Sequence, residues 1–234
     1  MKKFLFLITL LAMSSLAFSY QAEKSLTLPA DGIRKLSVDA GAGSLKIDGV
    51  EGLSSIEVTA EIIVRGVSDR RIDDYLNDHL RLSLEKEGAE AILNGYFKSR
   101  HFSLFFGEAL VNLTVRVPKA MDLYVDDGSG WLTVDNVRGE VTISDGSGDL
   151  TVTNIEGNLI IDDGSGSIET RNVTGDVRID DGSGSMTIVR VGGTVTVDDG
   201  SGGITIDDIA KDVVLESTGS GSVETSNIRG RIIR

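Results

Sequence analysis

The sequence has no cysteine, only 2 prolines, and aromatic residues that make up just 5% of its 234 residues. Without cysteine there is no disulfide and no cysteine-linked lipid anchor, so the fold must depend on its core and its backbone hydrogen bonds. Basic residues are scarce as well: the sequence has 23 Lys and Arg and 36 Asp and Glu, which gives a formal charge of -13. Such an acidic surface repels phosphate groups, and we therefore expect no nucleic-acid partner.

Long apolar runs are missing except at the N-terminus. Lys2 and Lys3 precede an apolar run over residues 4–13, and Ala17-Phe18-Ser19 fits the small-x-small pattern of a cleavage site. We predict that residues 1–19 form a signal peptide, the alternative being a retained anchor. No later segment reaches about 18 apolar residues, so we expect no stable membrane insertion after cleavage. The expected location is periplasmic, cell-surface or secreted.

An 18-residue repeat fills the second half of the chain. An (Asp or Ser)-Asp-Gly-Ser-Gly run recurs every 18 residues, and a sixth, shorter copy at 218–221 follows after 19; the first glycines of the five full runs are Gly128, Gly146, Gly164, Gly182 and Gly200. Apolar residues alternate between the runs, which is strand periodicity, and the segments are too short for helices. We predict an all-β fold, a β-solenoid (parallel β-helix-like) of 18-residue coils stacked about 4.8 Å apart.

The first half contains one detached copy of the repeat. Residues 36–52 match residues 123–139 position by position, and the less regular residues 53–117 lie between them. That stretch suggests a long strand over 53–64, a helix over 68–78, a hairpin from 80–84 and 89–97, and a strand over 110–117. We predict an N-terminal β region, 20–120, with one detached rung and a cap, followed by a regular β-solenoid, 121–234, together forming one continuous domain.

Three features resemble the bacterial DUF4097 family, whose members are called "putative adhesins". They are a leading Val-x-x-Gly-x-Gly-Ser rung from Val38 to Ser44, a strand that ends in Val117-Pro118, and the tandem Asp-Gly-Ser-Gly rungs. The resemblance covers residues 24–234. It implies a β-solenoid in a cell-envelope or surface setting, and it supplies no catalytic residues. The period is more regular here than in most members.

Aspartates give the repeat its strongest chemical feature. One stands before each glycine run and should stack along one edge of the solenoid: Asp127, Asp145, Asp163, Asp181 and Asp199. Like carboxylates about 5 Å apart repel, so the stack needs turn N–H donors, water or cations. We favour Asx-type turn capping. The alternative is a calcium site, since calcium takes 6–8 oxygens, although the Gly-Gly-x-Gly-x-Asp signature of calcium β-rolls is missing. No other cofactor is expected.

The remaining candidate residues favour structural roles. We expect Phe97, Phe102, Phe105 and Phe106 to cover the open end of the core; the alternative is a binding patch with Trp131. His79 and His101 are expected at the surface or in the cap. The repeated serines are turn residues with no histidine near them, and Arg171, Arg178 and Arg190 show no common cluster.

These observations predict an exported, non-enzymatic structural or interaction protein, adhesin-like, that binds an envelope protein or glycan. A calcium-binding solenoid is the second hypothesis, and an extracytoplasmic polysaccharide-acting enzyme is the third. The last rung carries Arg229, Arg231 and Arg234. We favour the interpretation that they keep the exposed strand edge monomeric. The other interpretation is self-association through the C-terminal edge, by docking on the aspartates of a neighbouring molecule.

Overall fold

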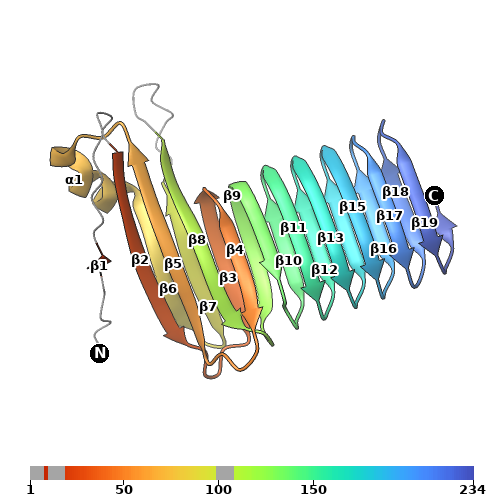
Figure 1. The fold of residues 1–234 in the computed structure, drawn as a ribbon, viewed down its shortest axis with the longest axis horizontal. Coiled ribbons are helices and arrows are strands. Elements are labelled where there is room, and N and C mark those ends of the chain that lie inside the picture. Colours follow the sequence, from red (N-terminus) through yellow and green to blue (C-terminus); the bar gives the residue numbers. More distant parts are fainter. Residues whose placement is uncertain (1–7, 10–18, 99–107) are drawn as a thin grey trace.

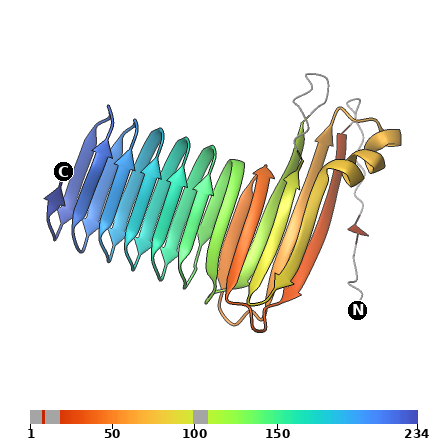
Figure 2. The same ribbon diagram turned by 180° about the vertical axis from the view of Figure 1, so that it is seen from behind.

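The computed structural model describes residues 8–9, 19–98 and 108–234, and these form a β-solenoid of stacked coils, as predicted (Figure 1). Two sheets lie face to face, and the coils stack along the long axis with the C-terminus at one end. Figure 2 shows the same stack from behind, where the strands of the other sheet come to the front. The predicted signal segment lies outside the described residues except for positions 8, 9 and 19. In the described part of the chain, no helix is long and apolar enough to cross a membrane.

Each regular coil gives one strand to each sheet. Sheet B contains β10 (Val141–Asp145), β12 (Leu159–Asp163), β14 (Val177–Asp181), β16 (Val195–Asp199), β18 (Val213–Thr218) and β20 (Ile232–Ile233). Sheet A contains β11 (Gly148–Ile155), β13 (Gly166–Val173), β15 (Gly184–Val191), β17 (Ile204–Ile209) and β19 (Val223–Ile228). The longer β9 (Asp122–Asp135) runs through both sheets and begins the array.

Neighbouring coils pair in parallel with an offset of one repeat. Ile161 pairs with Ile143 on one side and with Ile179 on the other, and all three side chains are buried. The predicted apolar columns are therefore correct, and together they fill one core between the sheets. The extra residue before the last coil appears as a register shift after Val197, where Asp198 pairs with Ser217.

The detached rung lies directly against the first coil of the array. It forms β3 (Lys35–Ala42) and β4 (Leu45–Val50), and both pair in parallel with β9. Leu36 pairs with Leu123 and Leu45 with Leu132, which is the predicted alignment. The chain between the rung and the array adds strands on the far side of the rung, so both sheets continue without a break toward the N-terminal end.

Apart from the short β1, the added strands are longer than the regular strands of the same sheet (Figure 1). Sheet A continues through β8 (Ala109–Pro118), β5 (Ser55–Arg65), β2 (Ser19–Pro29) and β1 (Ile8–Thr9), and sheet B through β7 (Glu90–Phe97) and β6 (Leu80–Glu87). The predicted hairpin is confirmed as β6–β7. The predicted helix is α1 (Asp69–His79), which buries Ile72 in a small cluster against Ile62, Val64 and Val67, with Phe97 packed beside it. Phe102, Phe105, Phe106 and His101 lie outside the described residues.

Backbone conformation and stacking explain the second glycine of each Gly-Ser-Gly turn. The second glycine of the five full turns has a φ between 132° and 157° (Gly130, Gly148, Gly166, Gly184 and Gly202). Side-chain-bearing residues rarely adopt this backbone conformation. A Cβ atom on Gly166 would also lie 1.6 Å from the carbonyl oxygen of Gly148 in the coil below. Both the conformation and the close stacking therefore require glycine at this corner.

Candidate functional site

The five repeated aspartates lie inside the solenoid, at the corner between the two sheets. Along each strand of sheet B the inward positions alternate, so that Leu159, Ile161 and Asp163 point to the same interior. Successive aspartates pair in register across the coils. We call this set the aspartate column; its members are only 0–3% exposed: Asp127, Asp145, Asp163, Asp181 and Asp199. The sequence predicted the stack but placed it at an edge, whereas the structure places it in the core.

One oxygen of four of these carboxylates caps the following turn. Oδ1 of Asp163 accepts a hydrogen bond from the backbone N–H of Ser165 at 3.2 Å, and Asp181 and Asp199 accept from the serine two residues on at 3.0 and 3.1 Å. Asp145 makes the same contact at 3.3 Å. These are the expected Asx-type turns.

The other carboxylate oxygens of the aspartate column have no partner in the described part of the chain. Oδ2 of the same four residues is buried without a hydrogen bond, and both oxygens of Asp127 are in this state. Buried polar atoms in proteins are nearly always hydrogen-bonded, so a continuous set of such oxygens is unusual. The aspartate column thus offers a line of free acceptors inside a core whose other buried side chains, apart from Thr170, are apolar.

Burial makes every member of the aspartate column a weaker acid than an ordinary aspartate. Burial, followed by the charge of Asp145, raises the pKa of Asp127 to about 7. Burial, followed by the charges of Asp145 and Asp181, raises the pKa of Asp163 to about 6. Burial also raises the pKa of Asp145, Asp181 and Asp199. Each carboxyl therefore holds its proton to a higher pH than it would in water.

The aspartate column has defined ends. Below Asp127 the equivalent position is Ala40 of the detached rung, and above Asp199 it is Thr218. The acidic neighbours Asp126, Asp162, Asp180 and Asp198 point the other way, to the outer face of sheet B. Within residues 8–9, 19–98 and 108–234, no group of three or more His, Cys, Asp or Glu side chains is placed to hold a metal ion. Calcium binding by the aspartate column stays a prediction.

A second ladder, which sequence reasoning missed, stabilises the opposite corner. Six residues in equivalent positions have a φ between 53° and 61°: Asn136, Asn154, Asn172, Arg190, Asp208 and Asn227. Asparagine tolerates this left-handed conformation better than most residues. Asn172 Nδ2 donates to Asn154 Oδ1 at 2.8 Å, and Arg190 Nε donates to Asn172 Oδ1 at 2.6 Å. The repeated asparagine just before an apolar position was the available signal.

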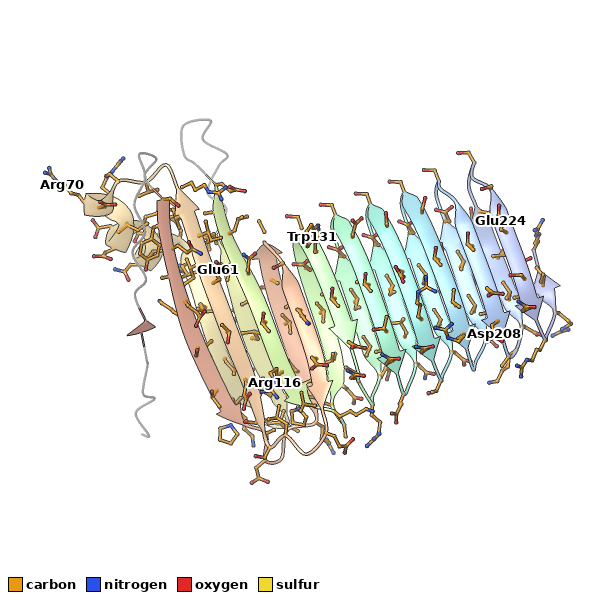
Figure 3. All side chains as sticks on the ribbon, viewed as in Figure 1. Glu61, Arg70, Arg116, Trp131, Asp208 and Glu224 are labelled. Atoms are coloured by element: carbon orange, nitrogen blue, oxygen red, sulfur yellow. The ribbon has the colours of Figure 1, made fainter. Side chains whose placement is uncertain are left out.

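In the described part of the chain, the outer surface carries few large apolar side chains, and Trp131 is the most exposed of them. Its side chain is 73% exposed, against 44% for Tyr124 and 37% for Ile160. Trp131 follows the corner glycine Gly130 and lies where the longer N-terminal strands give way to the regular coils (Figure 3). Its neighbour in the next coil is Asp149. The predicted partner of Trp131, Phe97, packs near α1 instead, so these two do not form one patch.

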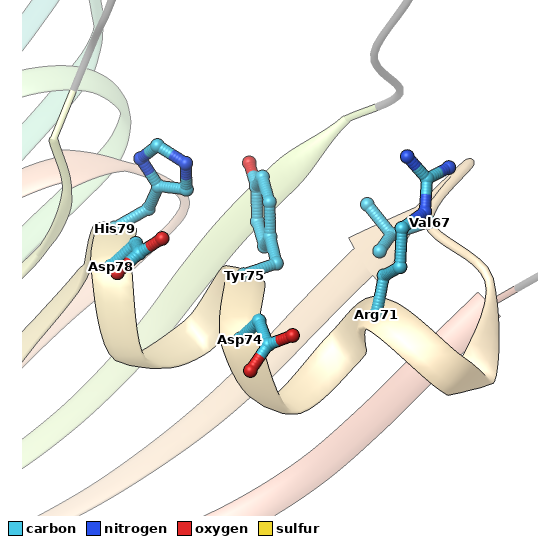
Figure 4. Close-up of a pocket in the computed structure, with 6 residues that line it drawn as sticks. All are labelled: Val67, Arg71, Asp74, Tyr75, Asp78 and His79. Carbon is cyan, nitrogen blue, oxygen red and sulfur yellow. The ribbon is translucent and has the colours of Figure 1, made fainter.

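Figure 4 shows a shallow depression beside α1, lined by Val67, Arg71, Asp74, Tyr75, Asp78 and His79. The rings of Tyr75 and His79 lie 4.6 Å apart. His79 is therefore a residue of the N-terminal cap, as the sequence suggested. Burial raises the pKa of Tyr75 above its ordinary value of 10.0.

Arginines of the array each contact a different neighbour. Arg178 pairs with Glu216 at 2.9 Å, and Arg171 pairs with Glu169. In the last coil, Arg231 pairs with Asp212 at 2.7 Å and Arg229 with Asp208 at 3.7 Å. Arg229 and Arg231 thus contact carboxylates of the preceding coil of their own chain.

The family model described as Toastrack DUF4097 matches residues 5–231. A search of curated proteins found no match. Among solved structures, a "putative cell adhesion protein" from Clostridium sporogenes is 16% identical, with coverage of 91% of this chain and 98% of that one and a TM-score of 0.41. A "putative lipid binding protein" from Parabacteroides distasonis is 13% identical (91% and 93% covered, TM-score 0.48), and a "putative adhesin" from Bacteroides fragilis is 13% identical (90% and 95%, TM-score 0.40).

Proposed function

The chain belongs to the Toastrack DUF4097 family, and from this premise we propose that it is a non-enzymatic, adhesin-like interaction protein of the cell envelope or surface. The observation that carries the proposal is Trp131, a large aromatic side chain left 73% exposed at a corner of a repetitive scaffold. Tryptophan is enriched at protein interfaces, because it contributes a large apolar area at a small entropic cost.

The scaffold suits a binding role because it is stiff. Each coil is hydrogen-bonded in register to the next through both sheets, and the core between the sheets is continuous. A surface on such a frame loses little conformational freedom when a partner binds. The outer face of sheet B carries a line of carboxylates, so the array favours a neutral or cationic partner over an anionic one.

An enzymatic role has less support. Catalysis needs acid, base or nucleophilic groups that converge on one substrate position. The aspartates of the array are enclosed in the core, and the arginines lie on separate contacts. We therefore propose an envelope protein or glycan as partner rather than a substrate, and an exported location that rests on the predicted signal segment.

A binding assay on the exported form tests this function. The purified chain is immobilised and probed with envelope extract from its source and with a glycan array. Replacing Trp131 with Ala should weaken the captured interaction about 30-fold, the effect of losing an aromatic hot spot. Ile160→Ala is the matched control, since Ile160 is an exposed apolar residue away from the Trp131 corner. Equal binding by the Trp131→Ala variant and the parent would contradict the proposal, as would a parent that captures nothing.

A further inference from the structure

We propose that the aspartate column is a proton-binding element, which makes the solenoid more stable in mildly acidic surroundings than at alkaline pH. The proposal is independent of the binding function and concerns the interior of the array. It rests on the unpartnered oxygens, on the absence of nearby positive charge among the described residues, and on the position of Asp127, Asp145, Asp163, Asp181 and Asp199.

The stacking brings the carboxyl groups close together. Paired parallel strands lie about 4.8 Å apart, and the five aspartates occupy the same inward position of successive strands. Adjacent carboxylates are therefore separated by about one strand spacing. Since they are 97% or more buried, water screens their repulsion only weakly.

No basic side chain in the described part of the chain faces the aspartate column. On the same strands, the outward neighbours Asp126, Asp162, Asp180 and Asp198 are acidic, and so is Asp39 of the adjoining rung β3. On the facing strands of sheet A, the inward residues nearest the corner are apolar: Leu132, Leu150, Ile168, Met186 and Ile204. The turns between the two sheets carry glycine and serine. Among the described residues, the charged side chains next to the aspartate column are thus acidic, and Arg178, on the outer face of β14, pairs with Glu216.

Protonation would remove the charge repulsion within the aspartate column and would also give its unpartnered oxygens hydrogen-bond donors. A protonated carboxyl is neutral, so it removes the repulsion between neighbouring coils. It also turns one acceptor oxygen into an O–H donor, and the adjacent carboxyl offers an unpartnered Oδ2 as acceptor. Because the groups are neighbours, their protons leave in coupled steps that belong to the set rather than to single residues.

The pH window follows from the direction of the shifts. The folded-state pKa lies above the ordinary value of 3.8, at about 7 for Asp127 and about 6 for Asp163. The stabilisation is therefore fully present below about pH 4 and is lost as the pH rises through about 6 to 7. Other carboxylates, such as Glu156 with its lowered pKa, act in the opposite direction at low pH. The contribution of the aspartate column must therefore be isolated by substitution.

Two nearly isosteric variants isolate it. Asp163→Asn removes the charge inside the core and keeps an oxygen for the N–H of Ser165; Asp162→Asn removes the same charge one residue earlier, on the outer face. Melting temperatures are measured between pH 5 and pH 8. The parent and Asp162→Asn should lose stability together as the pH rises, and Asp163→Asn should exceed both by about 5 °C at pH 8. Parallel profiles for all three proteins would overturn the proposal.

A titration of the parent protein keeps the test decisive if a variant does not fold. The Cγ chemical shifts of labelled aspartates, followed by NMR, should show midpoints above the ordinary value of 3.8 for the aspartate column, at about 7 for Asp127 and about 6 for Asp163. Ordinary midpoints throughout would refute proton binding. Melting at pH 8 with millimolar calcium separates the metal hypothesis, because a stabilisation that Asp163→Asn abolishes would assign the aspartate column to calcium instead.

Discussion

Replacing Gly166 with Ala should strongly destabilise the solenoid, although it adds a single methyl group. Gly166 is the second glycine of its turn, with a φ of 148°, and its Cβ position lies 1.6 Å from the carbonyl oxygen of Gly148. That oxygen is part of the backbone, so it cannot move away alone. The two coils must separate locally, or the turn must change its conformation.

The loss of stability caused by Gly166→Ala can be estimated from the backbone conformation and the hydrogen bonds at this corner. A residue with a side chain in this backbone region costs about 1–3 kcal/mol. Separating the coils also strains the hydrogen bonds from Gly148 N–H to Ser165 O and from Gly166 N–H to Ser183 O, both 3.0 Å long. Each is worth about 1 kcal/mol. We therefore expect a loss of about 3–5 kcal/mol in the free energy of unfolding, or about 10 °C in melting temperature.

Gly203→Ala provides the control for this prediction. Gly203 lies at the same corner, one position after the second glycine of its turn, and its φ is not positive. A Cβ atom there would approach only the hydroxyl oxygens of Ser185 and Ser222, at 3.7 and 3.9 Å. This variant should melt within about 2 °C of the parent in circular dichroism. If Gly166→Ala also melts like the parent, the inference that the turns stack too closely for a Cβ atom is wrong.

Two further predictions concern the core and the last coil. Ile161→Asp places an unpaired charge at a position that is 1% exposed, so it should cost more than about 4 kcal/mol of stability and prevent folding. Ile160→Asp, on the outer face, should be tolerated. Similar melting of the two variants would refute the inward assignment of Ile161. Replacing Arg229, Arg231 and Arg234 with Gln should increase self-association in sedimentation if these residues protect the strand edge. A salt-sensitive oligomer of the parent that becomes monomeric in the triple variant would support docking instead.

The array was predictable from the sequence because one coil fixes all the others. Once Val141 and Ile143 are recognised as inward, the constant spacing assigns Leu159, Ile161 and the rest without further information. Parallel stacking in register is the only arrangement that keeps each apolar column continuous. The position of the aspartate column could have been read in the same way, since two more residues along the strand lead from Ile143 to Asp145. Because these aspartates cap turns, the sequence suggested that they lie at an edge of the solenoid. Each of these side chains is in fact buried in the core, and four of the five also cap a turn.

The N-terminal region was less predictable because its strands lack the repeat. The strand over 53–64 and the strand over 110–117 were expected from their alternation, and they correspond to β5 and β8. Their antiparallel pairing, and their position on the far side of β4 from β9, depend on which strand edges are free in the folded protein. A local pattern does not contain that information.

The N-terminal end of the aspartate column shows that the turn does not depend on an acid. In the detached rung the same inward position holds Ala40, yet the rung stacks in register with the first coil and its Gly43 has the same kind of positive φ, 138°. An alanine or threonine at each of the five acidic positions would avoid the burial of a carboxyl group, which costs free energy whenever the group is charged. Turn capping uses only one oxygen of Asp145, Asp163, Asp181 and Asp199 and leaves the second unpartnered. A continuous line of such groups therefore has an effect that turn formation does not require, and the effect that its burial dictates is a dependence of stability on proton concentration.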